Sequence, residues 1–90
     1  MTDRTSIMSE IRVRSEGSYD VWHIGVTQDL DATAALWEEA MKENTALWMD
    51  WETESVDDAV AIAEHFVALG MVPGPAENLD REAAAYVYVF

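Results

Sequence analysis

The sequence predicts one small α+β domain, in which a mainly antiparallel sheet carries two helices and the elements follow the order β-β-α-β-α-β. The length of 90 residues suits one domain and is too short for two. Hydrophobic residues make up 50% of the chain and include four tryptophans, enough for one core. Two segments alternate in polarity and two others are rich in β-branched and aromatic residues, as in strands, while apolar residues recur at helical spacing in two more.

The first half of the chain predicts a hairpin followed by a helix. Residues 1–6 are expected to be a disordered tail. Residues 7–15 alternate in polarity and predict a half-exposed strand. A turn signal at 16–18 leads to residues 19–27, whose β-branched and aromatic side chains predict the second strand of the hairpin. Residues 30–43 have the apolar spacing of a helix.

The second half predicts a strand, a helix, a loop and a strand. Residues 45–53 alternate again and predict the third strand. Ser55 begins a capping-box pattern, so a helix is expected from there to about Leu69, with Gly70 closing it. Residues 71–83 read as a loop. Residues 84–90 have no polar face, so we expect this last strand inside the sheet or paired across a dimer.

Charge is the most unusual feature of the composition. Eighteen acidic residues face five basic ones, a formal net charge of −13, and Lys42 is the single lysine. Such a charge repels itself at low salt, and molar salt shortens the Debye length to about 3 Å. The composition therefore predicts a protein of a salt-rich cytoplasm. It argues against nucleic acid as a partner at ordinary salt, because that affinity depends on neutralising phosphates.

Two absences in the sequence narrow the function further. The chain has no cysteine, which excludes a disulfide, a thiolate metal site and a cysteine nucleophile. No apolar run approaches the roughly 20 residues of a membrane helix, and the N-terminus lacks the apolar core of a signal peptide. We expect a cytoplasmic protein without a membrane partner.

A few polar and aromatic residues are candidates for a site. His23 and Gly25 share one face of the second strand, where an imidazole could act and a glycine would let a ligand approach the backbone. Glu64 borders the apolar stripe of the second helix and is the candidate ligand for a divalent metal. Trp48 shares its strand face with acidic residues and is a candidate contact residue. The first three also have a purely structural interpretation: a hydrogen-bonded strand histidine, tight packing at the glycine and a solvated carboxylate.

The run from His23 to Leu30, His-Ile-Gly-Val-Thr-Gln-Asp-Leu, resembles the second half of the GIY-YIG nuclease signature. The hairpin, helix, strand, helix order over residues 7–70 is similar to that family's layout. The resemblance implies that the helix 57–69 carries the family's metal-binding glutamate at Glu64. Asn78 is a further residue that the resemblance leaves as a candidate.

The chain departs from the family pattern at the residues that carry catalysis. The first motif is missing from the segment around residues 11–13, and His23 stands at the second tyrosine. Thr33 stands near the expected arginine, and a threonine cannot stabilise a phosphoryl charge as a guanidinium does. We therefore expect a non-catalytic binding module, whose partner is a protein or a second copy of the chain. Two alternatives remain open: a diverged metal-dependent hydrolase using His23 and Glu64, and a structural partner subunit.

Overall fold

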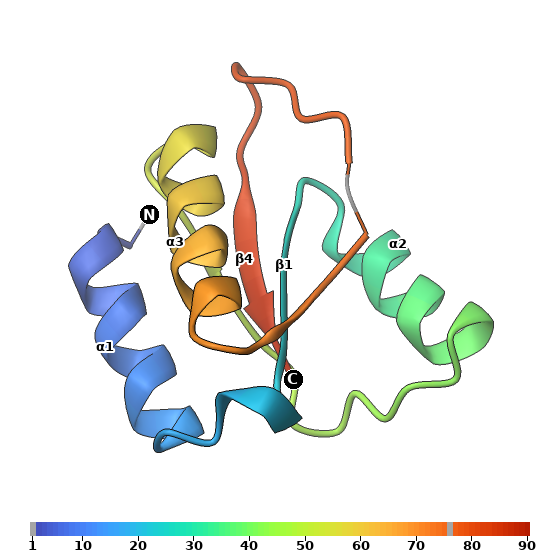
Figure 1. The fold of residues 1–90 in the computed structure, drawn as a ribbon. Coiled ribbons are helices and arrows are strands. Elements are labelled where there is room, and N and C mark those ends of the chain that lie inside the picture. The colour runs from blue at the N-terminus through green and yellow to red at the C-terminus, as the bar shows by residue number, and fades with distance from the viewer. Residues whose placement is uncertain (1, 76) are drawn as a thin grey trace.

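The computed structural model describes residues 2–75 and 77–90, which form three layers (Figure 1). A four-stranded mixed sheet has the order β2-β4-β1-β3. Helices α1 and α3 cover one face and α2 covers the other. The α+β class is therefore confirmed, whereas the predicted order of elements and the mainly antiparallel sheet are only partly right, because a short strand within the predicted loop 71–83 pairs in parallel.

Most elements follow one another with short connections, and the longer ones precede β2 and β4. Their bounds, in chain order, are α1 Arg4–Ser15, the 3-10 turn η1 Tyr19–Val21, β1 His23–Thr27, α2 Leu30–Ala35, the π-helical turn η2 Leu36–Ala40, β2 Met49–Glu52, α3 Val56–Ala68, β3 Val72–Pro73 and β4 Tyr86–Val89. β4 runs antiparallel to both β1 and β2, and β1 pairs with β3 in parallel.

The main correction concerns residues 7–15, which belong to helix α1 and not to a strand. Ile7 and Ile11 are buried against the core, whereas Val13 is 72% exposed, which an alternating strand would not allow. A spacing of four puts two residues on one side of a strand and also on one side of a helix. Asp3 decides for the helix, because its carboxylate accepts a hydrogen bond from the Ser6 amide at 3.0 Å.

The chain before α1 is placed by contacts with β2. Residues 1–6 were expected to form a disordered tail, and Met1 of this range lies outside the described residues. Thr2, however, forms a parallel bridge with Thr53, and its amide donates to the Glu52 carbonyl at 2.8 Å. With α1 in the place of the expected first strand, the predicted hairpin does not form, and the neighbours of β1 are β4 and β3.

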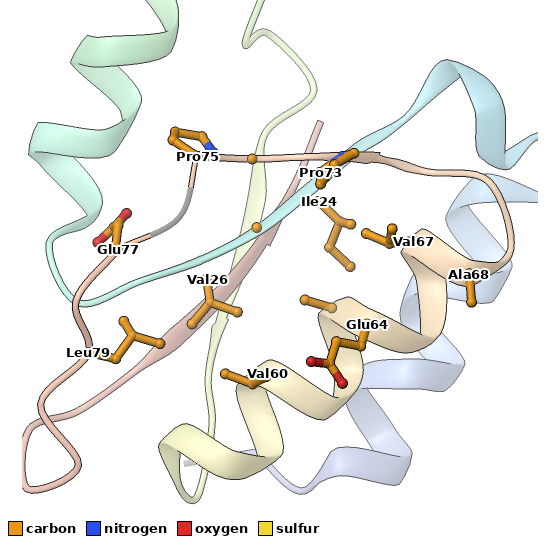
Figure 2. A pocket seen from close by; sticks show the side chains of 13 residues that line it. Ile24, Val26, Val60, Glu64, Val67, Ala68, Pro73, Pro75, Glu77 and Leu79 are labelled. Atoms are coloured by element: carbon orange, nitrogen blue, oxygen red, sulfur yellow. The ribbon is translucent and has the colours of Figure 1, made fainter.

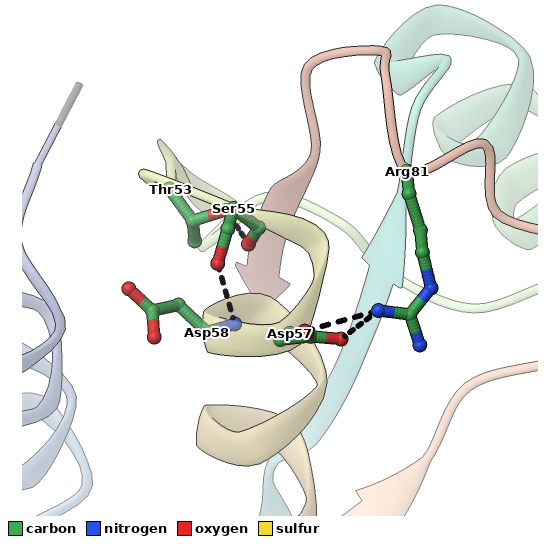
Figure 3. Close-up of polar contacts among 5 residues, drawn as sticks. All are labelled: Thr53, Ser55, Asp57, Asp58 and Arg81. Carbon is green, nitrogen blue, oxygen red and sulfur yellow. Dashed lines mark hydrogen bonds and ion pairs between the residues drawn. The ribbon is translucent and has the colours of Figure 1, made fainter.

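Helix α3 matches the prediction in position and in capping. Ser55 accepts a hydrogen bond from the Asp58 amide at 3.1 Å, while Arg81 pairs with Asp57 at 2.9 Å (Figure 3). Gly70 ends the helix at φ +121°, a conformation that glycine adopts without strain. The buried face of α3 packs on the sheet through Val56, Ala59, Ile62 and Phe66.

The last strand, β4, lies inside the sheet, which is the first of the two positions expected from its lack of a polar face. Val87 and Val89 point into the core under α3, and Tyr88 points toward the layer of α2. All three are almost fully buried. This strand therefore separates two apolar clusters, one on each face of the sheet.

Candidate functional site

Strand β1 sends its side chains alternately to the two faces of the sheet, and this alternation decides which candidate residues meet. Ile24 belongs to the core under α3, and Val26 packs against that core. His23 contacts the aromatic cluster on the α2 side. Glu64, on α3, borders a pocket floored by Ile24 and Val26. His23 and Glu64 therefore lie on opposite faces of the sheet.

His23 is held in a stack of aromatic rings. Its imidazole is parallel to the Phe90 ring at 4.6 Å and edge-on to Trp37 at 5.2 Å. The shared metal or catalytic site of His23 and Glu64 is thus not formed. In the described parts of the chain, no three His, Asp or Glu side chains gather closely enough to hold a metal ion.

On the face of the sheet that it shares with His23, the space beside Gly25 is filled by the Tyr88 side chain, so a ligand does not approach the backbone from that face. A Cβ atom there would lie 2.3 Å from the Tyr88 hydroxyl oxygen and 2.4 Å from the ring carbon beside it. The same hydroxyl accepts a hydrogen bond from Trp37 Nε1 at 3.0 Å. Trp48, half-buried, stacks on the Tyr88 ring at 4.5 Å and closes this face. These residues form a second small core.

Thr33 is buried and takes part in a polar cluster that the sequence did not predict. Its hydroxyl lies 2.7 Å from the hydroxyl of Thr27. The Glu77 carboxylate lies within hydrogen-bond distance of both, at 3.1 Å from Thr27 and 3.3 Å from Thr33. The signal for this cluster was two threonines on inner faces, since buried hydroxyls need polar partners. Glu77 thereby ties the segment after β3 to β1 and α2.

The segment that Glu77 ties down forms one wall of an apolar pocket of about 510 Å³ (Figure 2). The opposite wall is α3, and β1 is the floor. The residues that line the pocket are Ile24, Gly25, Val26, Val60, Ala63, Glu64, Val67, Ala68, Pro73, Gly74, Pro75, Glu77 and Leu79. Asn78 is exposed and does not line it, although both of its neighbours do.

The pocket exists because β3 is short and α3 has small side chains there. β3 pairs with β1 through the Val72 amide, which donates to the Trp22 carbonyl at 2.9 Å, and the Gly74 amide, which donates to the Ile24 carbonyl at 2.8 Å. Pro73 and Pro75 alternate with these donors, and because proline has no amide proton they cannot donate from the outer edge of β3 to another strand. Ala63 and Ala68 leave room between α3 and the floor.

Two carboxylates provide the charge at the pocket. Figure 2 shows Glu64 projecting from α3 and Glu77 standing on the opposite wall. Glu77 is engaged with the threonine hydroxyls, whereas the exposed Glu64 makes no ion pair or hydrogen bond with the residues that the structure describes. No basic side chain is among the described lining residues. The pocket is therefore apolar inside and negative at its rim.

Comparison with known proteins gives no relative to which the site could be related. No protein-family model matches the chain, and no curated protein or solved structure matches it. As for the membrane, none of the helices in residues 2–75 and 77–90 has the length and apolar character needed to cross it.

Proposed function

We propose that this domain is a non-catalytic binding module whose ligand is a small apolar molecule carrying a positively charged amine. The pocket between α3 and β1 is the binding site. The observation that carries the proposal is the combination of an apolar interior with a negative rim. A binding module is also the function that the sequence led us to expect, but the proposed site lies on the α3 face of the sheet and not on the His23 face.

The size and lining of the pocket suit a small molecule. Ligand pockets measure about 300–1,000 Å³ and are mostly apolar with a few polar groups that fix orientation. At about 510 Å³, this one could enclose a ring or a short branched chain. Aliphatic side chains from β1, α3 and the segment after β3 (Ile24, Val67 and Leu79) supply the apolar contacts.

Charge selects among apolar ligands. An ammonium group at the mouth would lie near the Glu64 carboxylate, while an anion would meet Glu64, Glu77 and the net charge of −13. Like charges brought together at a site oppose binding, and opposite charges speed and strengthen it. A neutral ligand should bind with intermediate affinity.

Three isosteric probes test this order: 3-phenylpropylammonium, 3-phenylpropanol and 3-phenylpropionate. In amide NMR spectra, we expect shifts at Ile24, Val26 and Val67, with affinity falling from the cation to the alcohol to the anion. Glu64→Gln should lower the affinity for the cation by about twofold to fivefold, which is the contribution expected of a partly exposed ion pair. Glu39→Gln makes the same change of charge on η2, away from the pocket, and should leave the affinity for the cation unchanged.

A blocking variant separates the site from a general surface effect. Ala63→Leu places a larger side chain in the pocket and should remove binding of all three probes while the far-UV circular dichroism stays that of a folded α+β protein. Shifts that persist in Ala63→Leu, or an anion that binds as well as the cation, would contradict the proposal.

A further inference from the structure

A second pocket, of about 450 Å³, lies in the groove between α1 and α3. Its lining residues are Arg4, Thr5, Met8, Arg12, Ala61 and His65. On α3, Ala61 and His65 face this groove, and Ala63 and Glu64 face the apolar pocket. The two pockets therefore lie on different sides of the same helix.

The charge of this groove is opposite to that of the rest of the molecule. Three of the five basic residues of the chain lie on α1, and two of them, Arg4 and Arg12, line the groove together with His65. Among the residues placed by the structure, no carboxylate lines it. In a chain of net charge −13, an anion is repelled over most of the surface, and the two arginines, with no carboxylate among the described lining residues, make anion binding less opposed at this groove.

The two arginines are not equivalent. Arg4 lies 3.9 Å from Asp58, an ion pair at the outer limit of contact, which partly neutralises that end of the groove. In residues 2–75 and 77–90, no carboxylate pairs with Arg12 or with His65. The end of the groove at Arg12 and His65 is therefore the one with uncompensated donors.

The groove between these ends is long and partly apolar. Arg4, Met8 and Arg12 follow one another at intervals of four along one side of α1, so the two arginines are about 12 Å apart along the helix axis at about 1.5 Å per residue. The thioether of Met8 lies between them, opposite Ala61. A single anionic group would fill only one end of a groove of this length.

We infer that Arg12 and His65 form a site for the phosphate group of a small phosphorylated molecule, whose uncharged body lies over Met8 and Ala61. A guanidinium presents a planar fork that binds two phosphate oxygens at once, and an imidazole N–H can donate to the third. A phosphate has more acceptor oxygens than a carboxylate and can therefore accept hydrogen bonds from both the Arg12 guanidinium and the His65 imidazole.

Phenyl phosphate is the probe, because it joins a phosphate to a small apolar body. Titrated at 0.1 M KCl and followed by amide NMR, it should shift Met8, Arg12, Ala61 and His65 and bind more tightly than inorganic phosphate. Arg12→Gln should weaken binding about tenfold or more, as expected for loss of a charge-assisted hydrogen bond. His65→Gln should weaken it about threefold or more.

Arg14→Gln is the matched control. Arg14 is exposed on α1, and it carries the same charge two residues further on without lining the groove. This variant should change the affinity by less than about twofold. Equal weakening by Arg12→Gln and Arg14→Gln would mean diffuse attraction to α1 and would overturn the inference, as would the absence of shifts at Arg12 and His65.

A phosphate can also be that of a lipid headgroup, and a vesicle experiment distinguishes the two sources. The protein should remain in the supernatant when sedimented with phosphatidylglycerol vesicles, since most of its surface is repelled by an anionic membrane. The inference of a small-molecule ligand would be overturned if the wild type sedimented with the vesicles, Arg12→Gln abolished this sedimentation, and phenyl phosphate did not bind. Ala63→Leu, which blocks the other pocket, should leave phenyl phosphate binding unchanged, so the two sites are tested independently.

Discussion

Replacing Gly25 with alanine tests the packing of Tyr88 in the small core on the α2 face of the sheet. The added Cβ would lie 2.3 Å from the Tyr88 hydroxyl oxygen, whereas non-bonded heavy atoms prefer about 3.5–4.0 Å. The Tyr88 ring must therefore move by more than about 1 Å. It is confined on several sides, because Trp48 stacks on it and its hydroxyl also fills the place of a Cβ on Gly74, at 2.3 Å.

The cost follows from two effects. Overpacking of a full core costs about 1–3 kcal/mol. Displacing the hydroxyl also removes the acceptor of the Trp37 indole N–H, and an unsatisfied buried donor costs about 1–3 kcal/mol. Gly25→Ala should therefore lower the free energy of unfolding by about 2–6 kcal/mol, a large part of the roughly 5–15 kcal/mol of a domain.

Urea denaturation in 1 M KCl, followed by tryptophan fluorescence, measures this cost, and a second background isolates its cause. In Tyr88→Val the ring is gone, so Gly25→Ala should cost less than about 0.5 kcal/mol or stabilise the strand slightly. The coupling between the two substitutions should then be about 2 kcal/mol or more.

Gly17→Ala provides the control for this cycle. Gly17 has φ +82° and open space where a Cβ would lie, so alanine should cost about 1 kcal/mol from backbone strain in both backgrounds. If Gly25→Ala costs the same with and without the Tyr88 ring, the steric argument is refuted.

Two further predictions concern pH and salt. Burial, together with the charge of Glu77, raises the pKa of Tyr88 above 10.0, although the Trp37 hydrogen bond opposes the rise. The unfolded chain then loses the Tyr88 proton at lower pH than the folded chain does, so the free energy of unfolding should fall as pH rises above about 10. In urea denaturation, the difference in stability between the wild type and Tyr88→Phe should therefore narrow above that pH. A difference that stays constant from pH 8 to 11 would contradict this. The melting temperature should rise from low to molar KCl, because screening removes repulsion among eighteen acidic residues while the described residues form only two ion pairs, both at the surface. Glu39→Gln with Glu43→Gln should reduce the rise, and a melting temperature independent of KCl would remove the inference of a salt-rich cytoplasm.

Local signals in the sequence were sufficient for several elements. Ser55 before a run of helical period predicts α3, and the structure confirms this helix. The prediction was possible because the cap and the apolar stripe both lie within one segment of the sequence. Within the predicted strand 19–27, the alternation was correct over β1, which placed Ile24 and His23 on different faces, whereas residues 19–21 form the 3-10 turn η1 and not a strand. The apolar β4 was expected inside the sheet for the same kind of reason, since neither of its sides suits water.

Other features depend on contacts between distant segments. Ile7 and Ile11 fit one face of a strand and one face of a helix equally, and only the packing of α1 beside α3 exposes Val13. Glu77 could not be selected from the sequence, because its partners Thr27 and Thr33 are 50 and 44 residues away along the chain.

The sequence by itself determined the class of the domain, its charge and the two faces of β1, because composition and period are properties of a single segment. The tertiary structure alone decided that His23 and Glu64 are separated by the sheet, and that Arg12 lies across a groove from His65. The periodicity of apolar residues shows to which side of a helix or strand a side chain points, whereas only the packing of helices and strands decides which other residues that side chain contacts.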